Sequence, residues 1–343
     1  MRAQFPLLNS CLAIICALTV AWPATGAESP GVKYAGKTGP VKAKQIVLVS
    51  GDEEYRSEEM LPQLGKILAA HHGFECTVLF PIDTADGTIH PNVSNIPGLE
   101  ALKTADLLIL MTRFRDLPDD QMQHIADYLE SGKPIIGIRT ATHAFNIPDN
   151  KKFAKFSFNN KDWDGGFGRQ VLGETWINHH GNHGSESTRG IIAPDAKEHP
   201  ITRGLQDGDI WGPTDVYGVR LPLPKGCQPV VLGQVVDGMS ANDPPVKGEK
   251  NEPMMPIAWT YHYAAENGKL ARIFTSTMGS AQDFENEGYR RLLVNAAYWA
   301  LNMDDQIKPG AKVEIVGEYR PSKFAFNGFV KGKKPSDHEW EGK

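Results

Sequence analysis

The sequence predicts a doubly wound, mostly parallel α/β sheet that carries a long, loop-rich insertion. Two observations support this prediction. Four short apolar segments alternate with helix-forming segments over residues 45–138, and strands that alternate with helices pair in parallel within one sheet. Over residues 146–254 these regular patterns give way to aromatics, glycines and prolines. We expect one α/β domain over residues 45–302, with the first and fourth of these strands adjacent at the centre of the sheet.

Each element follows from a local pattern. Strands are predicted where short apolar runs are bounded by glycine or polar residues, and helices where apolar residues recur on one face. The predicted strands cover residues 45–49, 74–80, 106–111, 134–138, 190–193, 229–234, 257–259 and 271–275. The predicted helices cover residues 58–71, a segment that Pro118 opens and Gly132 ends, and about 286–301.

The two ends of the chain are predicted to lie outside the domain. Residues 1–27 are typical of a cleaved signal peptide, because Arg2 precedes a mainly apolar run over residues 5–22 that leads to small residues. A membrane anchor is the alternative, but polar residues interrupt the run and it is short for a span. We therefore expect a secreted or periplasmic protein that has no membrane contact after cleavage. Residues 28–44 are predicted to be a linker, and residues 303–343 a C-terminal tail that wraps the surface or stays loose.

Composition narrows the range of partners. The net charge is −5 with both signs interleaved, and no basic stripe indicates nucleic acid as a partner. Cys76 and Cys227 remain after cleavage, and an oxidising compartment would permit a disulfide. Since Cys76 lies in a predicted buried strand, an inert core thiol is the favoured interpretation.

Ligands of such sheets bind beyond the carboxyl ends of the strands, which selects the residues to consider. Arginine, acid and aromatic side chains follow these strands and recur in the insertion. Guanidinium groups bond sugar hydroxyls and carbonyls well, or they could simply pair with the neighbouring acids. Flat aromatics beside carboxylates, at residues 163–169 and 211–217, suit a carbohydrate. The predicted substrate-binding residues are Asp52, Glu54, Tyr55, Arg56, Arg113, Arg115, Arg139, Trp176 and Tyr217.

A sharp turn is predicted after the fourth strand, as in nucleophile elbows. Arg139, Thr140, Thr142 and His143 occupy it, without cysteine or serine. This composition excludes a cysteine-dependent amidase. Thr140 would need an adjacent base such as His143 to act as a nucleophile. A hydrogen-bonded structural role is the alternative for that histidine.

Residues 176–184 bring together three of the 11 histidines, His179, His180 and His183. Imidazole is the commonest side-chain metal ligand and titrates near neutral pH, although a solvated polar loop is an alternative. Because adjacent side chains tend to point apart, a zinc or other divalent-metal site would take His179 or His180, then His183, then a distant acid or His143. Without a metal, the same residues could perform acid–base chemistry.

Several of these segments together resemble the ThuA-like (trehalose-utilisation) family, in particular its secreted members from planctomycete-type bacteria. The resemblance covers nearly the whole mature chain, and it rests on residues 49–56, 137–143, 173–179, 199–201, 277–279 and 295–300. It implies a class I glutamine amidotransferase-like, flavodoxin-like fold without the catalytic cysteine. It also implies a part in disaccharide catabolism, with a glycoside or keto-glycoside as substrate.

The resemblance carries over to individual residues with some departures. His143 matches a family histidine after the elbow strand. Residues 176–179 match an aromatic-x-x-His-Pro segment, except that His180 replaces the proline. Residues 215–217 correspond loosely to an Asp-Glu-x-Tyr segment that here lacks one acid.

A further family histidine, in a Leu-Gly-His segment, is replaced by Ser280, and His180 or His183 could substitute for it. We therefore expect a hydrolase or lyase that uses His143, His179 and Asp215 as catalytic residues. A non-catalytic carbohydrate-binding module is the alternative.

Overall fold

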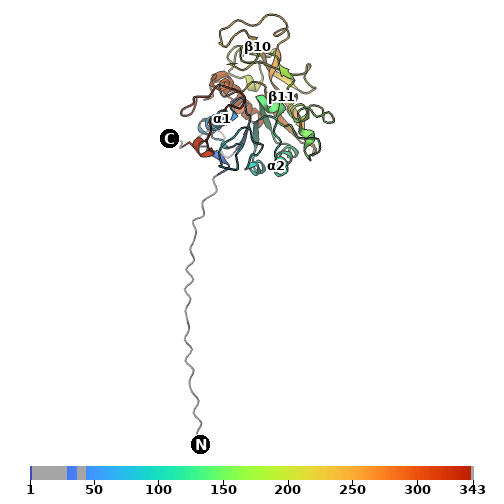
Figure 1. Cartoon of the computed structure of the whole chain (residues 1–343). Coiled ribbons are helices and arrows are strands. Elements are labelled where there is room, and N and C mark those ends of the chain that lie inside the picture. Colours follow the sequence, from blue (N-terminus) through green and yellow to red (C-terminus); the bar gives the residue numbers. More distant parts are fainter. Residues whose placement is uncertain (2–28, 37–43, 341–343) are drawn as a thin grey trace.

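The computed structural model describes residue 1, residues 29–36 and residues 44–340. The predicted signal peptide falls almost entirely on residues 2–28, outside the described residues. No helix in the described part of the chain is long and apolar enough to cross a membrane. Figure 1 shows how the elements are arranged, with β10 toward one end of the folded part, α2 at the other and β11 between them.

Ten strands of the described residues form one sheet, in the order β1-β3-β2-β4-β5-β12-β11-β10-β7-β8. Their bounds are β1 (Gly31–Tyr34), β3 (Glu75–Leu79), β2 (Gln45–Gly51), β4 (Leu107–Thr112), β5 (Ile135–Ile138), β12 (Leu270–Ser276), β11 (Met255–Ala264), β10 (Gln228–Val236), β7 (Ser187–Ile192) and β8 (Trp211–Gly212). The five strands from β3 to β12 pair in parallel, and the others join antiparallel on both sides. The predicted α/β fold is confirmed, with its parallel part at the core.

The order of the first strands differs from the prediction. β4 lies between β2 and β5 and pairs with both, so the first and fourth predicted strands are not adjacent. The chain places β3 on one side of β2 and then returns to place β4 on the other side. The direction of winding therefore reverses at β2, and ligands of such sheets bind at this kind of switch point.

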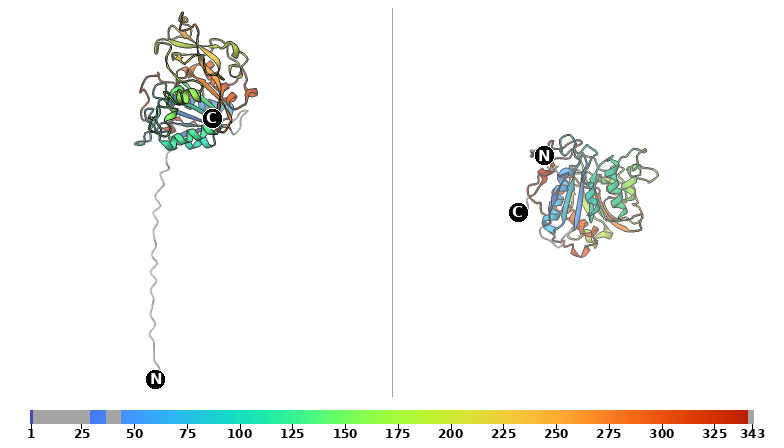
Figure 2. Two further views of the ribbon diagram at one scale, coloured as in Figure 1. Left: turned by 90° about the vertical axis from the view of Figure 1, so that its right-hand side faces the viewer. Right: turned by 90° about the horizontal axis from the view of Figure 1, so that it is seen from below.

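Helices cover both faces of the sheet. Successive side chains of a buried strand point to opposite faces, so each central strand contributes to two apolar cores. Ile46 and Leu48 of β2 belong to one apolar core, which also includes side chains of α1 (Ser57–His72) and α4 (Glu287–Ala300). Val47 and Val49 belong to a second core, with side chains of α2 (Asp119–Glu130) and α3 (Gly166–Gln170). The antiparallel strands β11, β10, β7 and β8 follow β12 on one side of the sheet, and the region around β10 lies at one end of the molecule (Figures 1 and 2).

Part of the predicted linker is a strand. Residues 31–34 form β1, which pairs antiparallel with β3 and buries Val32 and Tyr34. An unpaired edge of β3 would expose backbone donors and acceptors, and β1 satisfies them. Cys76 of β3 is buried and Cys227 is partly buried, and both are free thiols.

Candidate functional site

The sharp turn after β5 carries a buried, positively charged side chain, that of Arg139. The 3₁₀ helix η2 (Arg139–His143) begins directly after β5, and Arg139 has φ 47°, a left-handed conformation that is uncommon for a residue with a side chain. Its side chain is fully buried. The Nη1 atom donates hydrogen bonds to the carbonyl oxygens of Asp215, at 2.8 Å, and Thr277, at 2.7 Å. An anchoring arginine thus occupies the sharp turn after β5.

Arg139 makes an ion pair with Asp215. Its Nη2 atom lies 2.9 Å from Asp215 Oδ1, and its Cζ atom lies 3.6 Å from the ring centroid of Tyr217 and 4.4 Å from that of Tyr55. Burial by itself would raise the pKa of Asp215. The Arg139 charge and hydrogen bonds from two histidines outweigh burial and hold this pKa well below its usual range. Asp215 is therefore an ionised, buried carboxylate.

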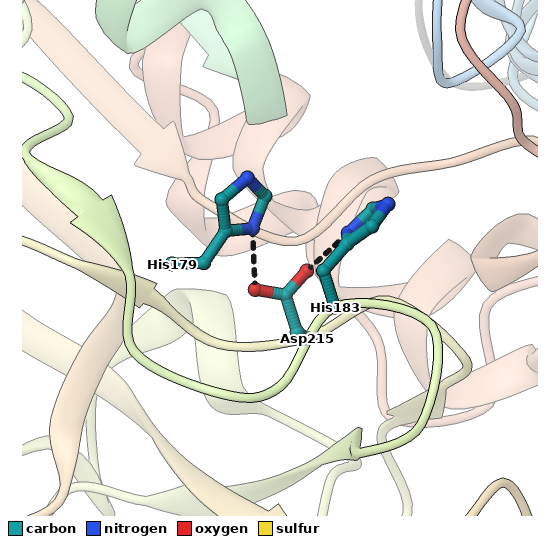
Figure 3. Close-up of side chains that lie close together, drawn as sticks. All are labelled: His179, His183 and Asp215. Atoms are coloured by element: carbon teal, nitrogen blue, oxygen red, sulfur yellow. Dashed lines mark hydrogen bonds and ion pairs between the residues drawn. The ribbon is translucent and has the colours of Figure 1, made fainter.

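Two histidines share this carboxylate (Figure 3). His179 Nδ1 lies 2.7 Å from Asp215 Oδ2, and His183 Nδ1 lies 3.1 Å from Oδ1. An ionised carboxylate can only accept hydrogen bonds, so both Nδ1 atoms must be protonated. Figure 3 shows the second nitrogen of each ring pointing away from Asp215. Asp215 therefore fixes the tautomer and orientation of both imidazoles.

Strand pairing in the insertion selects His179 over His180. β6 (Asn178–His179) pairs antiparallel with β9 (Tyr217–Gly218), and this places His179 beside Asp215. His180 points elsewhere, and its Nε2 atom lies 2.9 Å from the carbonyl oxygen of Lys250. Of the two alternatives for the first metal ligand, the structure therefore brings His179 to the cluster and leaves His180 outside it.

The loop after β2 brings a second carboxyl group to the cluster. Asp52 accepts hydrogen bonds from the backbone N–H groups of Glu54 and Tyr55, at 3.2 and 2.6 Å, and burial raises the pKa of Asp52 to about 7. The turn that it shapes directs Glu54 Oε1 to a point 3.3 Å from His183 Nε2. Burial raises the pKa of Glu54, although Arg113 and Arg139 oppose this effect. Glu54 and His183 are thus two titratable groups in contact.

The predicted arginines divide into two groups. Arg113 forms an ion pair with Glu53 and comes within 3.7 Å of Glu54, so it reaches the cluster. Arg115 also pairs with Glu53, at 3.2 Å, but it donates its remaining hydrogen bonds to the backbone of Arg113 and the 91–93 loop. Arg56 faces the C-terminal tail, with its Nε atom 3.4 Å from the Lys323 carbonyl oxygen. Arg115 and Arg56 are therefore structural here.

Seven side chains contact one another in a closed ring, which we call the site ring. In order of contact they are His179, His183, Phe326, Arg113, Phe114, His143 and Trp176. Neighbours lie 4.7 to 6.3 Å apart, between ring centroids or from Arg113 Cζ to a ring centroid. Tyr217 contacts three members, His179, His143 and Trp176, at 5.3, 5.8 and 6.1 Å. The structure thus brings His143, His179 and the 52–56 loop together.

His143 is a buried member of the ring. Burial, together with the charges of Arg113, Arg139 and His179, holds its pKa well below the usual range, so the imidazole is neutral at physiological pH. Its Nδ1 atom lies 3.2 Å from Thr142 Oγ1. The Thr140 hydroxyl, by contrast, has no hydrogen-bond partner in the described part of the chain. The contact expected of a Thr140–His143 nucleophile pair is therefore not formed.

The departures from the family pattern have structural explanations. Ser280 stands where the resemblance implies a histidine, and its hydroxyl accepts a hydrogen bond from the Asp283 backbone at the start of a 3₁₀ turn. His183 instead supplies the second imidazole of the cluster. Phe114 and Phe326 were missed as site residues. Phe326 lies in the tail, where no periodic apolar pattern marks it.

Three groups of the cluster could hold a metal ion. His179, His183 and Asp215 each offer one ligand atom, and these atoms lie within 4.8 Å of one another. Two imidazoles and a carboxylate suit a divalent transition metal. However, Arg139 already bonds the same carboxylate, and both Nδ1 atoms are engaged by it. An ion liganded by Asp215 would have to displace these hydrogen bonds.

A cavity of about 1290 Å³ lies away from the site ring. Trp163, Tyr261 and Tyr263 are among the residues that line it. The predicted aromatic segment at residues 163–169 therefore does not join the histidines. A second cavity, of about 530 Å³, is lined by Gly184, which follows His183, and by Phe324 of the C-terminal tail, among others.

Comparisons with known proteins agree with the motifs. A family model described as ThuA, trehalose utilisation, matches residues 46–300. Among solved structures, a ThuA-like protein from Bacteroides uniformis is 18% identical over 84% of this chain and 99% of its own, with a TM-score of 0.46. One from Parabacteroides merdae is 14% identical over 83% of this chain and 99% of its own, with a TM-score of 0.47. No curated protein matches the chain.

Proposed function

Because the chain belongs to the ThuA (trehalose utilisation) family, we propose that it is an acid–base enzyme acting on a glycoside. One observation carries the proposal: a single buried, ionised Asp215 orients both His179 and His183 through their Nδ1 atoms. Their Nε2 atoms are then the groups that can exchange protons. A module that only binds sugar has no need of a buried ion pair that sets two tautomers, so catalysis is favoured over the binding module.

The surroundings of the two imidazoles suggest different roles. His179 Nε2 has no hydrogen-bond partner among the described residues, so we assign it the role of general base. His183 Nε2 lies 3.3 Å from Glu54 Oε1, so we assign this pair the role of general acid. Enzymes commonly divide acid and base roles by giving two groups different environments. Asp215 and Arg139 are positioning residues, and so is the buried His143.

A keto-glycoside suits this arrangement. In a sugar with a ketone at C3, the proton on C2 is acidified, and the glycosidic oxygen leaves from C1. The base takes the C2 proton, the C–H electrons form a carbon–carbon double bond, and the C1–O bond breaks. The leaving oxygen keeps that electron pair and takes a proton from the acid. The two imidazole centroids lie 4.8 Å apart, which supports proton transfers at neighbouring atoms.

Trp176 supplies a partly exposed aromatic ring beside His179. We assign it contact with the sugar, together with Arg113, whereas Tyr217 is fully buried and packs against His143, His179 and Trp176. Asp52, Arg56 and Arg115 act indirectly, by shaping the loops around them. A secreted or periplasmic location, inferred from the N-terminal sequence alone, would place the substrate outside the cytoplasm.

Turnover of 3-keto-trehalose by the purified protein tests the proposal. We expect His179→Ala to lower kcat on the order of 10²–10⁴-fold. His180→Ala is the matched control, because this adjacent histidine bonds Lys250 outside the cluster, and it should behave as the wild type. If His179→Ala turns over the substrate as fast as His180→Ala, His179 is not the general base. Sugar binding without turnover by the wild type would favour the binding-module alternative.

A metal-assisted enzyme is the second candidate, because His179, His183 and Asp215 present three ligand atoms close together. A bound zinc or other divalent ion would supply a Lewis acid and a water of lowered pKa. Chelation followed by addition of zinc or manganese separates the two candidates. Turnover that survives thorough chelation leaves acid–base chemistry, whereas loss that the ion restores supports the metal.

A further inference from the structure

The site ring is completed by a residue outside the family domain. The family model ends at residue 300, whereas Phe326 belongs to the C-terminal tail. The Phe326 ring lies 6.3 Å from that of His183, and the Arg113 Cζ atom lies 5.1 Å from its centroid. A residue beyond the matched segment therefore forms part of the ring around the proposed catalytic histidines.

The tail is held against the site by specific contacts. The backbone N–H groups of Ala325 and Asn327 donate to the carbonyl oxygens of Glu54 and Glu53, at 3.0 and 2.9 Å. Between them, these bonds fix the backbone on both sides of Phe326. The attached loop is the one that carries the proposed acid, so the tail and the catalytic groups are positioned together.

A buried neighbour in the tail strengthens this attachment. Phe324 is buried, with its ring centroid 5.6 Å from that of Tyr55 and 5.4 Å from that of His183. Phe326 in contrast is 55% exposed. A single exposed aromatic residue is ordinary on a protein surface. Phe326, however, lies beside a proposed catalytic histidine, and its backbone is anchored on both sides. This placement favours contact between its exposed ring and a ligand.

Aromatic rings stand on both sides of the histidine pair. Trp176 contacts His179, and Phe326 contacts His183. A substrate with two sugar rings could place one ring on each aromatic residue and its glycosidic bond at the imidazoles. A substrate with a small leaving group would use only one of them.

We propose that Phe326 is a specificity-determining residue that stacks on the second sugar ring of a two-ring glycoside. This proposal rests on the proposed function, because it places the scissile bond at His179 and His183. The tail thereby selects glycosides whose leaving group is itself a sugar over those with a small leaving group.

The test compares two probes, 3-keto-trehalose with two rings and methyl 3-keto-α-glucoside with one. The measured quantity is kcat/KM for the two-ring probe divided by kcat/KM for the one-ring probe. Phe326→Ala should lower this ratio about 3- to 10-fold, mainly by raising KM for the two-ring probe. Phe326→Trp should restore the ratio. Val330→Ala is the matched control, because Val330 is 48% exposed in the same tail and has no place in the site ring, and it should keep the wild-type ratio.

The outcomes separate this proposal from the proposed function. If the wild type turns over both probes and Phe326→Ala keeps the ratio, the specificity role is overturned while the proposed function stands. An equal loss with both probes, accompanied by a lower Tm, would mean that Phe326 only secures the tail, and this also overturns the proposal. If the wild type turns over neither probe, both proposals fall.

Discussion

Arg139 Nη2 lies 2.9 Å from Asp215 Oδ1, and neither side chain is exposed to solvent. The first residue directly follows β5, a central strand of the sheet, and the second belongs to the insertion 76 residues further along. A buried ion pair is weak evidence of stability by itself, because desolvation opposes the attraction. Its clearer consequence is that Asp215 stays ionised where two histidines need an acceptor.

Loss of the Arg139 charge should destabilise the protein strongly. Arg139→Met leaves the buried Asp215 carboxylate unpaired, and we expect the free energy of unfolding to fall by about 3–5 kcal/mol. Denaturant unfolding at pH 7 measures this. Arg320→Met is the control, because Arg320 is 86% exposed in its pair with Glu318, and it should change little. A loss below about 1 kcal/mol for Arg139→Met would contradict the role given to the pair.

The strands could be predicted because buried parallel strands are short, continuous apolar runs. The predicted segments 45–49 and 271–275 lie within β2 and β12. Strand order could not be predicted, since both edges of β2 offer the same kind of backbone donors and acceptors and no local signal says which edge a later strand takes. β1 was missed because its alternation rests on Val32 and Tyr34 alone, inside a segment rich in glycine, proline and lysine.

The site could be predicted in part. The rule that ligands bind at the carboxyl ends of strands located Arg139, His143 and the 52–56 loop, and the cluster of histidines marked the insertion. The choice between His179 and His180 depends on the pairing of β6 with β9, a tertiary contact that no sequence pattern encodes. The place of Phe326 depends on backbone hydrogen bonds between the tail and a loop more than 250 residues earlier.

Glu58 should make stability depend on pH. Burial raises its pKa to about 8, and its carboxyl oxygens have no hydrogen-bond partner in the described part of the chain. Because Glu58 then holds a proton in the folded protein that it loses in the unfolded one, its contribution to the free energy of unfolding should fall as pH rises from about 5 to about 8. Glu58→Gln removes this ionisation, and its advantage over the wild type should reach about 3–5 kcal/mol above pH 8.

Denaturant unfolding at pH 5, 7 and 9 measures this difference for Glu58. The exposed Glu100→Gln is the control and should keep the wild-type slope. Asp52, whose pKa is raised to about 7, contributes a slope of the same sign in the wild type and in both variants. Parallel pH curves for wild type and Glu58→Gln would show that Glu58 does not carry the effect.

Gly168 should tolerate no side chain. A Cβ atom there would lie 2.1 Å from the backbone oxygen of Thr142, which a rotamer change cannot relieve. We expect Gly168→Ala to lower the free energy of unfolding by about 1–3 kcal/mol and to disturb the turn that carries His143. Gly310→Ala is the control, because nothing lies within 4 Å of its Cβ position, and it should be neutral or slightly stabilising. Equal stability of the two variants would contradict the close packing of α3 on η2.

Asp215→Asn should remove turnover by changing the tautomers of the histidines. An amide offers one acceptor and one donor in place of two acceptors, so His179 and His183 cannot both keep a proton on Nδ1. A histidine that faces the amide donor must accept with Nδ1 and carry its proton on Nε2, where it can no longer act as a base. We expect kcat to fall on the order of 10²–10⁴-fold.

This variant also leaves Arg139 unpaired, so the loss of kcat must be separated from unfolding. Turnover of 3-keto-trehalose is therefore measured well below the Tm of Asp215→Asn, after circular dichroism has shown the fold. Asp164→Asn is the matched control, because that carboxylate is 57% exposed in its pair with Arg220, and its kcat should stay near the wild-type value. A folded Asp215→Asn variant with kcat within tenfold of the wild type would show that the two imidazoles do not depend on Asp215, and the assignment of His179 as the base would lose its support.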